Sequence, residues 1–439
     1  MDYQKLHEHE VYPLPSGTGC LVYAPLSGSM FRLNHEEVDR LEKWLAGDNQ
    51  DDREAALLLE SIDKERVCKR TIPKKRTVGE LHKLTILPTY QCNFKCSYCY
   101  SAQGRERRTL SPKRAMAAID YFIDQNRTQL HDLWLAILGG GEPFLSPQLT
   151  GEIILRARKR AIDQGFSLGI GLTTNGSIYD AELSEIMVTN SVRLGVSFEV
   201  LKDIQEEQRQ NYERVVKTVR QYMNDGVDIT VKSIITPQNV SRLSEMVTEL
   251  HSLFPDIKKY KLQIVEDPTI FYDRNVMRYF YSQFTNHFFD AQETGYGMGI
   301  DVYVLASKYI DMLVEHYCGG EMCLNPEGTI TVCHRFSSPK EEKYQDIVYG
   351  SVSEDGKVLF DNDKFEKLMG HDIDMNPKCK SCFAKWHCGG GCLAQSMIYT
   401  DDQLDIICDW TRQFTKMILE RQISVAEKIR NEGRHKIFF

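Results

Sequence analysis

Residues 84–99 read LTILPTYQCNFKCSYC, and this stretch decides how the rest of the chain is interpreted. It begins with apolar and β-branched residues, which is typical of a buried strand. It ends in Cys92, Cys96 and Cys99, which are spaced C-x3-C-x2-C. Three thiolates can hold three irons of a [4Fe–4S] cube and leave the fourth iron open to another ligand. A closed zinc site or an accidental grouping is the alternative, but zinc usually takes paired C-x2-C units and residues 101–118 contain no Cys or His.

Strand and helix patterns alternate after this stretch, up to about residue 265. Six such repeats predict an α/β fold with a parallel sheet that is closed or partly closed into a barrel, and a doubly wound sheet is the alternative. In a barrel, the loop after a strand lies on the face where active sites are built. The expected strands are 81–87, 133–138, 168–174, 192–198, 228–235 and 259–265, and the expected helices are 112–126, 147–164, 180–189, 205–225 and 239–253.

The composition sets limits on the kind of protein. The chain has 439 residues, 42% of them apolar and 26% charged, which predicts a globular protein of several domains. Its 54 basic and 62 acidic residues give a net charge of −8, which argues against general nucleic-acid binding. No apolar run approaches membrane-spanning length, and the start MDYQKLHEHE lacks the apolar core of a signal peptide. A cytoplasmic location with no nucleic-acid or membrane partner is therefore expected.

The second group of cysteines lies near the C-terminus. The chain has 13 cysteines, many for a cytoplasmic protein, where clustered thiols bind metal or do chemistry more often than they form disulfides. Eight thiolates suit two fully ligated [4Fe–4S] clusters, and two structural zinc sites are the alternative. Regular periodicity fades after about residue 310, so we expect a region held by metal rather than by a large core, closed by a helix over 409–431. The eight are Cys318, Cys323, Cys333, Cys379, Cys382, Cys388, Cys392 and Cys408.

Residues 1–75 read as a small separate unit. A hairpin is predicted from strands at 20–24 and 30–33, because turn residues lie between them. Asn34 is a plausible N-cap for the next helix, with Glu37 as its capping-box partner. A second helix follows at 52–63. A winged-helix DNA binder and a mere packing appendage are alternative interpretations of this unit.

Taken together, the cysteine triad and the run GGGEP at 139–143 resemble the radical S-adenosylmethionine (SAM) superfamily. Alone, such a glycine run is more often a tight turn. In that family the open iron binds SAM, and one electron cleaves it to a 5′-deoxyadenosyl radical that abstracts a substrate hydrogen. The resemblance places Tyr98 beside the adenine. It implies that Gly140, Gly141 and Glu142 hold the amino group of SAM.

Polar residues after the third and fourth strands extend the implied SAM site. The family commonly places polar side chains here on the ribose hydroxyls and carboxylate of SAM. The resemblance therefore assigns Ser197 and Glu199 to SAM, and also Asn175, although Asn175-Gly176 can equally make a simple turn.

The run C-x2-C-x5-C-x3-C at 379–392 resembles the SPASM domain, an extension of radical SAM enzymes that modify peptides and proteins. The resemblance implies two auxiliary clusters, and so three [4Fe–4S] clusters in all. Cys323 departs from the pattern because it follows Cys318 instead of preceding it. It is expected to complete the first cluster, and an open iron there is the alternative. The implied ligands are Cys318, Cys333 and Cys392 for the first cluster, and Cys379, Cys382, Cys388 and Cys408 for the second.

The N-terminal unit resembles the small winged-helix-like domains (PqqD-like, RRE) that bind leader peptides during ribosomal peptide maturation. Such domains bind the leader as an added strand at a sheet edge. The expected domains are thus a leader-recognition unit at 1–75, a partial (β/α)6 TIM-type barrel at 76–305 and a SPASM domain at 306–439.

These resemblances imply a radical SAM oxidoreductase, a peptide cyclase that cross-links a precursor peptide carrying a leader, with flavodoxin or ferredoxin as electron donor. The overall pattern is similar to that of enzymes forming a Lys–Trp carbon–carbon bond. Thioether formation and formylglycine formation in sulfatases are alternatives, and a non-catalytic redox or DNA-binding sensor is a remote one. A base must accept a proton, and Glu321 and His334 are candidates because they lie beside cluster ligands; their alternative role is to support those ligands.

Overall fold

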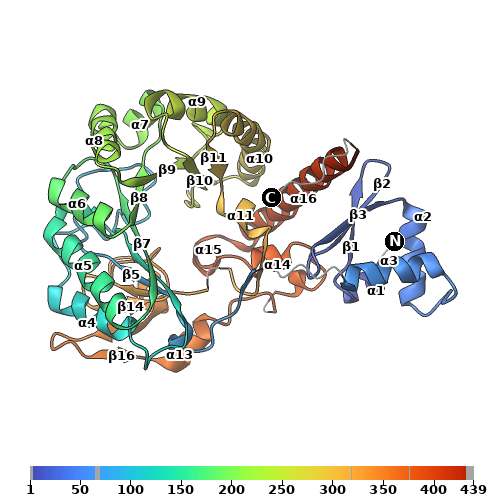
Figure 1. Ribbon diagram of the computed structural model, residues 1–439, viewed down its shortest axis with the longest axis horizontal. Coiled ribbons are helices and arrows are strands. Elements are labelled where there is room, and N and C mark those ends of the chain that lie inside the picture. Colours follow the sequence, from blue (N-terminus) through green and yellow to red (C-terminus); the bar gives the residue numbers. More distant parts are fainter. Residues whose placement is uncertain (1–2, 65–69, 318, 375, 432–439) are drawn as a thin grey trace.

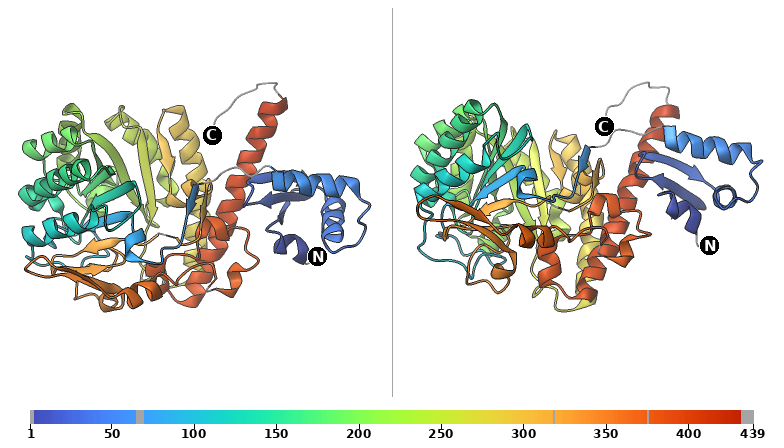
Figure 2. Two further views of the ribbon diagram at one scale, coloured as in Figure 1. Left: turned by 60° about the horizontal axis from the view of Figure 1, so that its bottom comes forward. Right: turned by 90° about the horizontal axis from the view of Figure 1, so that it is seen from below.

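The computed structural model describes residues 3–64, 70–317, 319–374 and 376–431. A large α/β unit lies at one end of the molecule and a small N-terminal unit at the other (Figure 1). The long helix α16 (Asp401–Asn431) runs between them, as further views make clear (Figure 2). No helix in the described ranges has both the length and the apolar character needed to cross a membrane.

The large unit is built on one sheet of eleven strands, in the order β11-β10-β9-β8-β7-β6-β5-β13-β14-β15-β16. Strands β5 to β11 are parallel neighbours in chain order, and β11 and β16 remain edges, so the sheet is not closed. The predicted α/β fold with a partial barrel is confirmed, and β11 adds a short seventh strand. The bounds are β5 Lys83–Ile86, β6 Asp132–Ile137, β7 Ser167–Thr174, β8 Val192–Ser197, β9 Asp228–Ile235, β10 Lys259–Ile264 and β11 Asp301–Tyr303.

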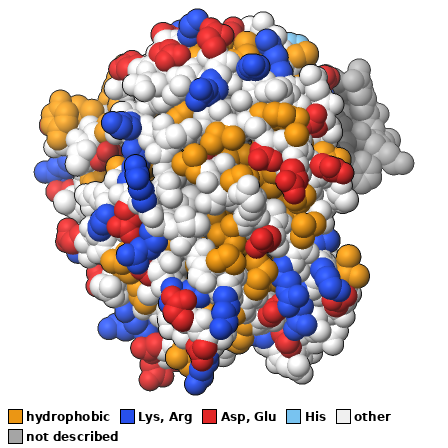
Figure 3. All heavy atoms as spheres, turned by 90° about the vertical axis from the view of Figure 1, so that its left-hand side faces the viewer, with side chains coloured by type: hydrophobic (Ala, Val, Ile, Leu, Met, Phe, Trp, Pro, Cys, Tyr) orange, Lys and Arg blue, Asp and Glu red, His pale blue; other side chains and the backbone are white. Residues whose placement is uncertain are grey.

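Helices cover the outer face of this sheet, and the burial of side chains along each strand alternates accordingly. In β7, Leu168, Ile170 and Leu172 are buried against the helices, while Gly169 and Gly171 face the inside of the barrel. The outer helices carry basic and acidic side chains interspersed with one another (Figure 3). Their bounds are α4 Pro112–Phe122, α5 Pro147–Asp163, α6 Ala181–Thr189, α7 Lys202–Gln208, α8 Tyr212–Asn224, α9 Leu243–Leu253 and α10 Arg274–Gly297.

Two helix predictions need correction, and one helix was not predicted. The helix expected over 205–225 is two helices, α7 and α8, because Gln210 and Asn211 have positive φ angles of 69° and 60°. Helix α10 was not predicted; it packs between α9 and α16 and buries several aromatic side chains. Helix α16 begins at Asp401, eight residues before the predicted start at 409.

The region after residue 310 contributes to the main core. Strand β13 pairs in parallel with β5, and β14 to β16 continue the same sheet as antiparallel strands. Met322, Ile330 and Tyr349 belong to the apolar core of the barrel, so the expectation of a region without a large core is wrong for these strands. The elements are α11 Leu305–Tyr309, β12 Met312–Val314, β13 Met322–Leu324, β14 Thr329–Thr331, α12 Tyr344–Ile347, β15 Val348–Val352, β16 Val358–Phe360, α13 Asn362–Leu368, α14 Lys385–Cys388 and α15 Leu393–Ile398; β12 pairs with β4, Arg70–Ile72.

The N-terminal unit is a three-stranded antiparallel sheet with helices on one face. The predicted hairpin is confirmed as β2–β3, and so is the Asn34–Glu37 capping box. Strand β1 was missed because Pro13 and Pro15 interrupt its pattern. The other face of the sheet packs against Leu419 and Ile423 of α16. The bounds are α1 Gln4–Glu8, β1 Tyr12–Ser16, β2 Gly19–Ala24, β3 Ser29–Leu33, α2 His35–Leu45 and α3 Arg53–Lys64.

Candidate active site

The three cysteines of the triad lie in the loop that follows β5, at the carboxyl edge of the parallel strands. Their side chains are half-buried and form no disulfide. Neighbouring loops hold this segment: Glu142 N–H donates to Gln91 O at 2.7 Å, and Ser97 N–H donates to Gln208 O at 3.0 Å. Burial raises the pKa of the thiols of Cys92 and Cys96. Metal binding would favour the thiolates, because the thiolate is the ligand form.

The glycine motif packs directly against the chain that leads into the triad. A Cβ atom on Gly141 would lie 2.2 Å from Gln91 O, and one on Gly140 would lie 2.7 Å from the ring of Tyr90. Glycine is therefore the residue that permits this approach. The loop after β6 is thus held against the cysteine loop.

Glu142 joins two of these loops. Its carboxylate is buried and accepts hydrogen bonds from Phe144 N at 3.1 Å, Thr174 Oγ1 at 2.7 Å and Asn175 N at 2.7 Å. Burial raises the pKa of Glu142, although these donors oppose the shift. The side chain therefore ties the end of β6 to the end of β7, a supporting role besides the predicted contact with SAM.

Tyr98, Glu199 and Arg209 form a buried polar group beside the triad. The Tyr98 hydroxyl donates to Glu199 Oε1, and Arg209 Nη1 donates to the Tyr98 hydroxyl at 2.9 Å. Glu199 also accepts from Ile234 N at 2.9 Å. Burial raises the pKa of Glu199 to about 7, against the pull of Arg209. This group fixes the ring of Tyr98 next to Cys99.

The other predicted SAM contacts lie around the same edge. Asn175 Nδ2 donates to Asn93 Oδ1 at 2.8 Å and lies 4.0 Å from the sulfur of Cys92. Ser197 ends β8 and is paired in register with Lys232 of β9. The structure thus brings all the predicted SAM residues to one edge of the sheet.

The residues present fit an iron–sulfur cluster with SAM. Arg209 is buried, and its Nε makes no hydrogen bond within the described ranges. A buried guanidinium with a spare donor suits an anionic group such as a carboxylate. Cys92, Cys96 and Cys99 would hold the cluster, and Arg209 with the glycine loop would hold SAM.

A family model decides this interpretation: residues 86–250 match the Radical SAM superfamily. The chain carries a radical SAM domain. The match runs from the last residue of β5 into α9 and includes the triad, the glycine motif and Arg209. It supports SAM binding and one [4Fe–4S] cluster at the triad.

Relatives of the radical SAM domain include enzymes that modify proteins and peptides. The chain is 19% identical to a cysteine-type anaerobic sulfatase-maturating enzyme of Clostridium perfringens, over 77% of this chain and 96% of the relative. It is 19% identical to the radical SAM cyclopropyl synthase TigE of Paramaledivibacter caminithermalis, over 81% and 78%. Streptococcus suis SuiB bound to its precursor peptide SuiA shares the fold, with a TM-score of 0.54 and 15% identity over 90% of this chain and 97% of SuiB.

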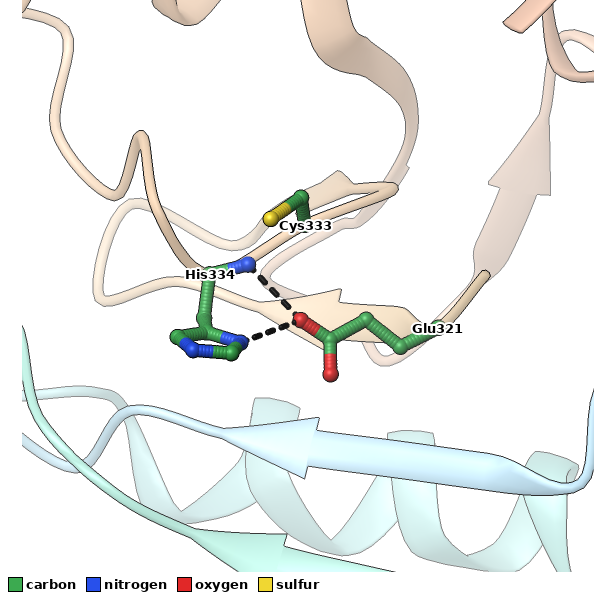
Figure 4. A group of neighbouring side chains, drawn as sticks. All are labelled: Glu321, Cys333 and His334. Carbon is green, nitrogen blue, oxygen red and sulfur yellow. Dashed lines mark hydrogen bonds and ion pairs between the residues drawn. The ribbon is translucent and has the colours of Figure 1, made fainter. Parts of the chain in front are cut away.

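Glu321 directly precedes β13, and His334 lies shortly after β14. Because β13 pairs with β5, both residues lie next to the start of the radical SAM domain. The ligand atoms of Glu321, Cys333 and His334 lie within 4.8 Å of one another (Figure 4). His334 donates to Glu321 Oε1 from its backbone N at 2.7 Å, and its Nδ1 lies 2.7 Å from the same oxygen. Glu321 Oε2 pairs with Lys83 Nζ at 2.5 Å and accepts from Thr85 Oγ1 at 2.6 Å. Its carboxylate therefore joins β5 to the cysteine-rich region.

The charge of Glu321 is compensated by its neighbours. Burial acts to raise the pKa of Glu321, but Lys83 and His334 outweigh it and hold the pKa well below its usual value. A separate metal ion at this group would have to displace the Lys83 ion pair. The contacts fit support of Cys333 better than an independent metal site.

The predicted auxiliary-cluster ligands are partly brought together. Four of these cysteines are close enough to act on one another electrostatically: Cys379, Cys382, Cys388 and Cys408. Burial, and to a smaller extent the three neighbouring thiols, raise the pKa of Cys388 to about 12. Cys323 and Cys333 both lie near Lys83, while Cys392 is the residue that immediately precedes α15. Cys318 lies outside the described residues.

Four cationic residues of the site were missed in the sequence. Arg209 lies in the turn that divides the predicted helix into α7 and α8. A turn after a barrel strand is the feature that could have pointed to this arginine. Lys83, Lys232 and Lys261 occupy inward positions of β5, β9 and β10. Lysine at alternate positions of an otherwise apolar strand was the signal for these, because such positions face away from the helices.

Proposed function

We propose that this chain is a cytoplasmic maturase of a ribosomally made peptide, which forms an intrapeptide side-chain cross-link, with a Lys–Trp carbon–carbon bond as the specific proposal. SAM with a cluster at the triad would supply a radical able to remove a hydrogen atom from an unactivated carbon, and two auxiliary clusters would supply an electron acceptor. Closing the cross-link removes two hydrogens from the peptide, so a proton and an electron must also leave. An external flavodoxin or ferredoxin would supply the reducing electron.

The observation that carries this proposal is the attachment of the N-terminal unit to the cysteine-rich region. Glu10 accepts from Lys385 Nζ and, at 2.8 Å, from Trp386 Nε1. The Tyr23 hydroxyl lies 2.7 Å from His387 Nε2, and it is the donor because His387 Nδ1 faces two backbone carbonyls. A peptide held by this unit is thus held by the same body that carries the proposed auxiliary clusters.

One edge of the small sheet suits an added strand better than the other. Proline is tolerated in a strand where its missing N–H faces away from the neighbouring strand. Pro13 and Pro15 therefore leave the outer edge of β1 without donors at two positions. Strand β3, Ser29–Leu33, contains no proline and pairs only with β2 within the described sheet. We propose that the leader binds along β3.

The remaining residues would orient the reactants. Arg209 and the glycine loop would hold SAM, and Tyr98, fixed by Glu199, would pack beside its adenine. Glu321 and His334 remain the proposed acceptors of the proton, since their hydrogen-bonded pair lies on the wall next to β5. The eight C-terminal cysteines are proposed to hold the two auxiliary clusters.

A second candidate is maturation of sulfatases, in which a Cys or Ser becomes formylglycine. The similarity to the Clostridium perfringens enzyme favours it, because the alignment spans nearly all of that protein. The N-terminal unit favours the peptide maturase instead. A thioether cross-link is a third outcome of the same radical chemistry.

The test uses anaerobically reconstituted full-length protein with SAM and dithionite. About twelve irons per chain are expected from three cubes. Formation of 5′-deoxyadenosine is then followed with a precursor peptide encoded beside the gene, and with a sulfatase-derived Cys peptide. Loss of two hydrogens from the precursor, without loss of sulfur, supports the cross-link. An aldehyde trapped by a hydrazine on the sulfatase peptide alone would establish formylglycine formation instead.

A further inference from the structure

Two lysines stand side by side on the inner face of the barrel sheet. Lys232 of β9 and Lys261 of β10 are direct register partners in adjacent parallel strands. Such partners lie about 4.8 Å apart and point to the same face. Both side chains are half-buried at inward positions, where the buried neighbours Val231 and Leu262 point the opposite way.

The barrel makes room for this pair. A Cβ on Gly195 of β8 would lie 2.3 Å from Lys232 Nζ, so the lysine lies across that glycine. Its ammonium reaches β7, where it donates to Thr173 Oγ1 at 2.9 Å. The site therefore spans the four neighbouring strands β7 to β10, and the glycine on β8 leaves room for the side chain of Lys232.

Neither lysine of the pair forms an ion pair with a carboxylate of the described residues. Thr173 is the hydrogen-bond partner of Lys232, and Lys261 has no ion pair with any residue that the structure describes. The nearby carboxylate of Glu321 forms an ion pair with Lys83. The carboxylate of Glu266 forms an ion pair with Arg335, with 3.6 Å between Oε2 and Nε. Burial lowers the pKa of Lys232 to about 7, and burial with the neighbouring Lys83 lowers that of Lys261, although the carboxylate of Glu266 opposes the shift of Lys261. Two adjacent lysines in a partly desolvated place favour binding of an anion, because the anion stabilises the protonated form of both amines.

We propose that Lys232 and Lys261 form a carboxylate-binding site, which takes an Asp or Glu side chain of the substrate peptide. This inference rests on the proposed function, since it assumes a peptide substrate inside the barrel. The carboxylate of SAM is already matched by Arg209, whose free donor lies beside the triad. The lysines lie on β9 and β10, the two strands that follow β8, and Lys232 is the register partner of Ser197 at the end of β8.

The test measures binding of two small probes to the reconstituted full chain with SAM and without reductant. The probes are N-acetylglutamate N-methylamide and its glutamine counterpart, and ligand-observed NMR relaxation reads their affinities. We expect the glutamate probe to bind about tenfold more tightly, as a charge-assisted hydrogen bond allows. Lys232→Met and Lys261→Met should abolish that preference, and Lys261→Arg should keep most of it. Lys259→Met is the matched control, because this exposed lysine lies on the same strand.

Each contrary outcome has a distinct meaning. Equal affinity of the two probes for the wild-type protein would overturn the inference. If Lys232→Met and Lys261→Met weaken SAM binding by the same factor as probe binding, the site belongs to SAM and the inference also fails. If a Met variant loses iron, Lys261→Gln is compared with Lys261→Arg instead. A preference for the glutamate probe that is kept by Lys261→Arg and lost by Lys261→Gln supports the inference, and an equal preference in both overturns it. A wild-type protein that prefers the glutamate probe but never forms 5′-deoxyadenosine would refute the proposed function alone.

Discussion

The two cysteine-rich regions of this chain differ in what supports them. The triad loop follows β5, whose Leu84 and Ile86 are fully buried in the main core. The cysteines of 379–408 lie on elements as short as the single turn α14, and Gly389, Gly390 and Gly391 all have positive φ there. Their thiols also raise one another's pKa. The first site is thus built by the barrel, whereas we expect the second to depend on its proposed metal to hold the cysteines together.

Removal of iron should separate the two regions most strongly. In protein stripped of iron anaerobically, we expect amide hydrogens of residues 376–408 to exchange rapidly, while those of β6 to β8 stay protected. The reason is that the strands keep their hydrogen bonds and core without metal, and the cysteine loops do not. Hydrogen-exchange mass spectrometry of the stripped and reconstituted proteins makes the comparison. Equal protection of 376–408 in both states would show that packing alone supports this region.

Gly141→Ala should damage the triad loop from the protein side. The new methyl group would clash with Gln91 O, which belongs to the backbone and cannot move aside as a flexible side chain could. We expect the free energy of unfolding to fall by about 2–3 kcal/mol, with loss of iron from the triad. Gly297→Ala is the control, since nothing lies within 4 Å of its Cβ position in α10. It should be neutral or stabilise by up to about 1 kcal/mol. Chemical denaturation and iron analysis measure both variants.

Arg209→Met should weaken SAM binding without removing iron. The substitution deletes a buried cation but keeps much of its apolar stem, so SAM affinity should fall about tenfold. Arg214→Met, at an exposed position of α8, should leave the affinity unchanged. Equilibrium dialysis with reconstituted protein gives both values. Wild-type affinity in Arg209→Met would remove this residue from the proposed SAM site.

Tyr23→Phe should have the smallest effect, at the junction of the N-terminal unit and the cysteine-rich region. It deletes the hydrogen bond to His387 Nε2, so the free energy of unfolding should fall by about 1 kcal/mol. Faster exchange around α14 should accompany this fall. The exposed Tyr272→Phe serves as the control. Unchanged exchange at α14 would mean that Glu10 and its partners hold the junction alone.

Much of the fold could be predicted because each buried strand carries its own signal. Strand β9 was predicted with its observed bounds, and the Asn34 cap was predicted with its partner. These features depend on residues close in sequence. The cysteines and the GGGEP motif were visible for the same reason, since the chemistry of the site lies in short segments.

The missed features depend on distant parts of the chain. Helix α10 is stabilised by α9 and α16, and β13 is a strand because β5 lies beside it. Arg209 gains its place from Tyr98 and Glu199, more than a hundred residues away in one case. The lysine pair required the register of β9 with β10, which the sequence does not give. The Pro-containing β1 was hidden because its edge position, rather than its composition, permits a strand.

Helix α16 also constrains how the length of this chain can change. Cys408 lies near one end of the helix, while Leu419, Ile423 and Glu427 contact the N-terminal sheet further along it. Each residue of a helix turns its successors by about 100°, as 3.6 residues complete a turn. One residue inserted between 408 and 419 would therefore rotate the docking face away from β2 and break the Arg32–Glu427 ion pair. Insertions and deletions between 408 and 419 should therefore be tolerated only when they nearly complete whole helical turns.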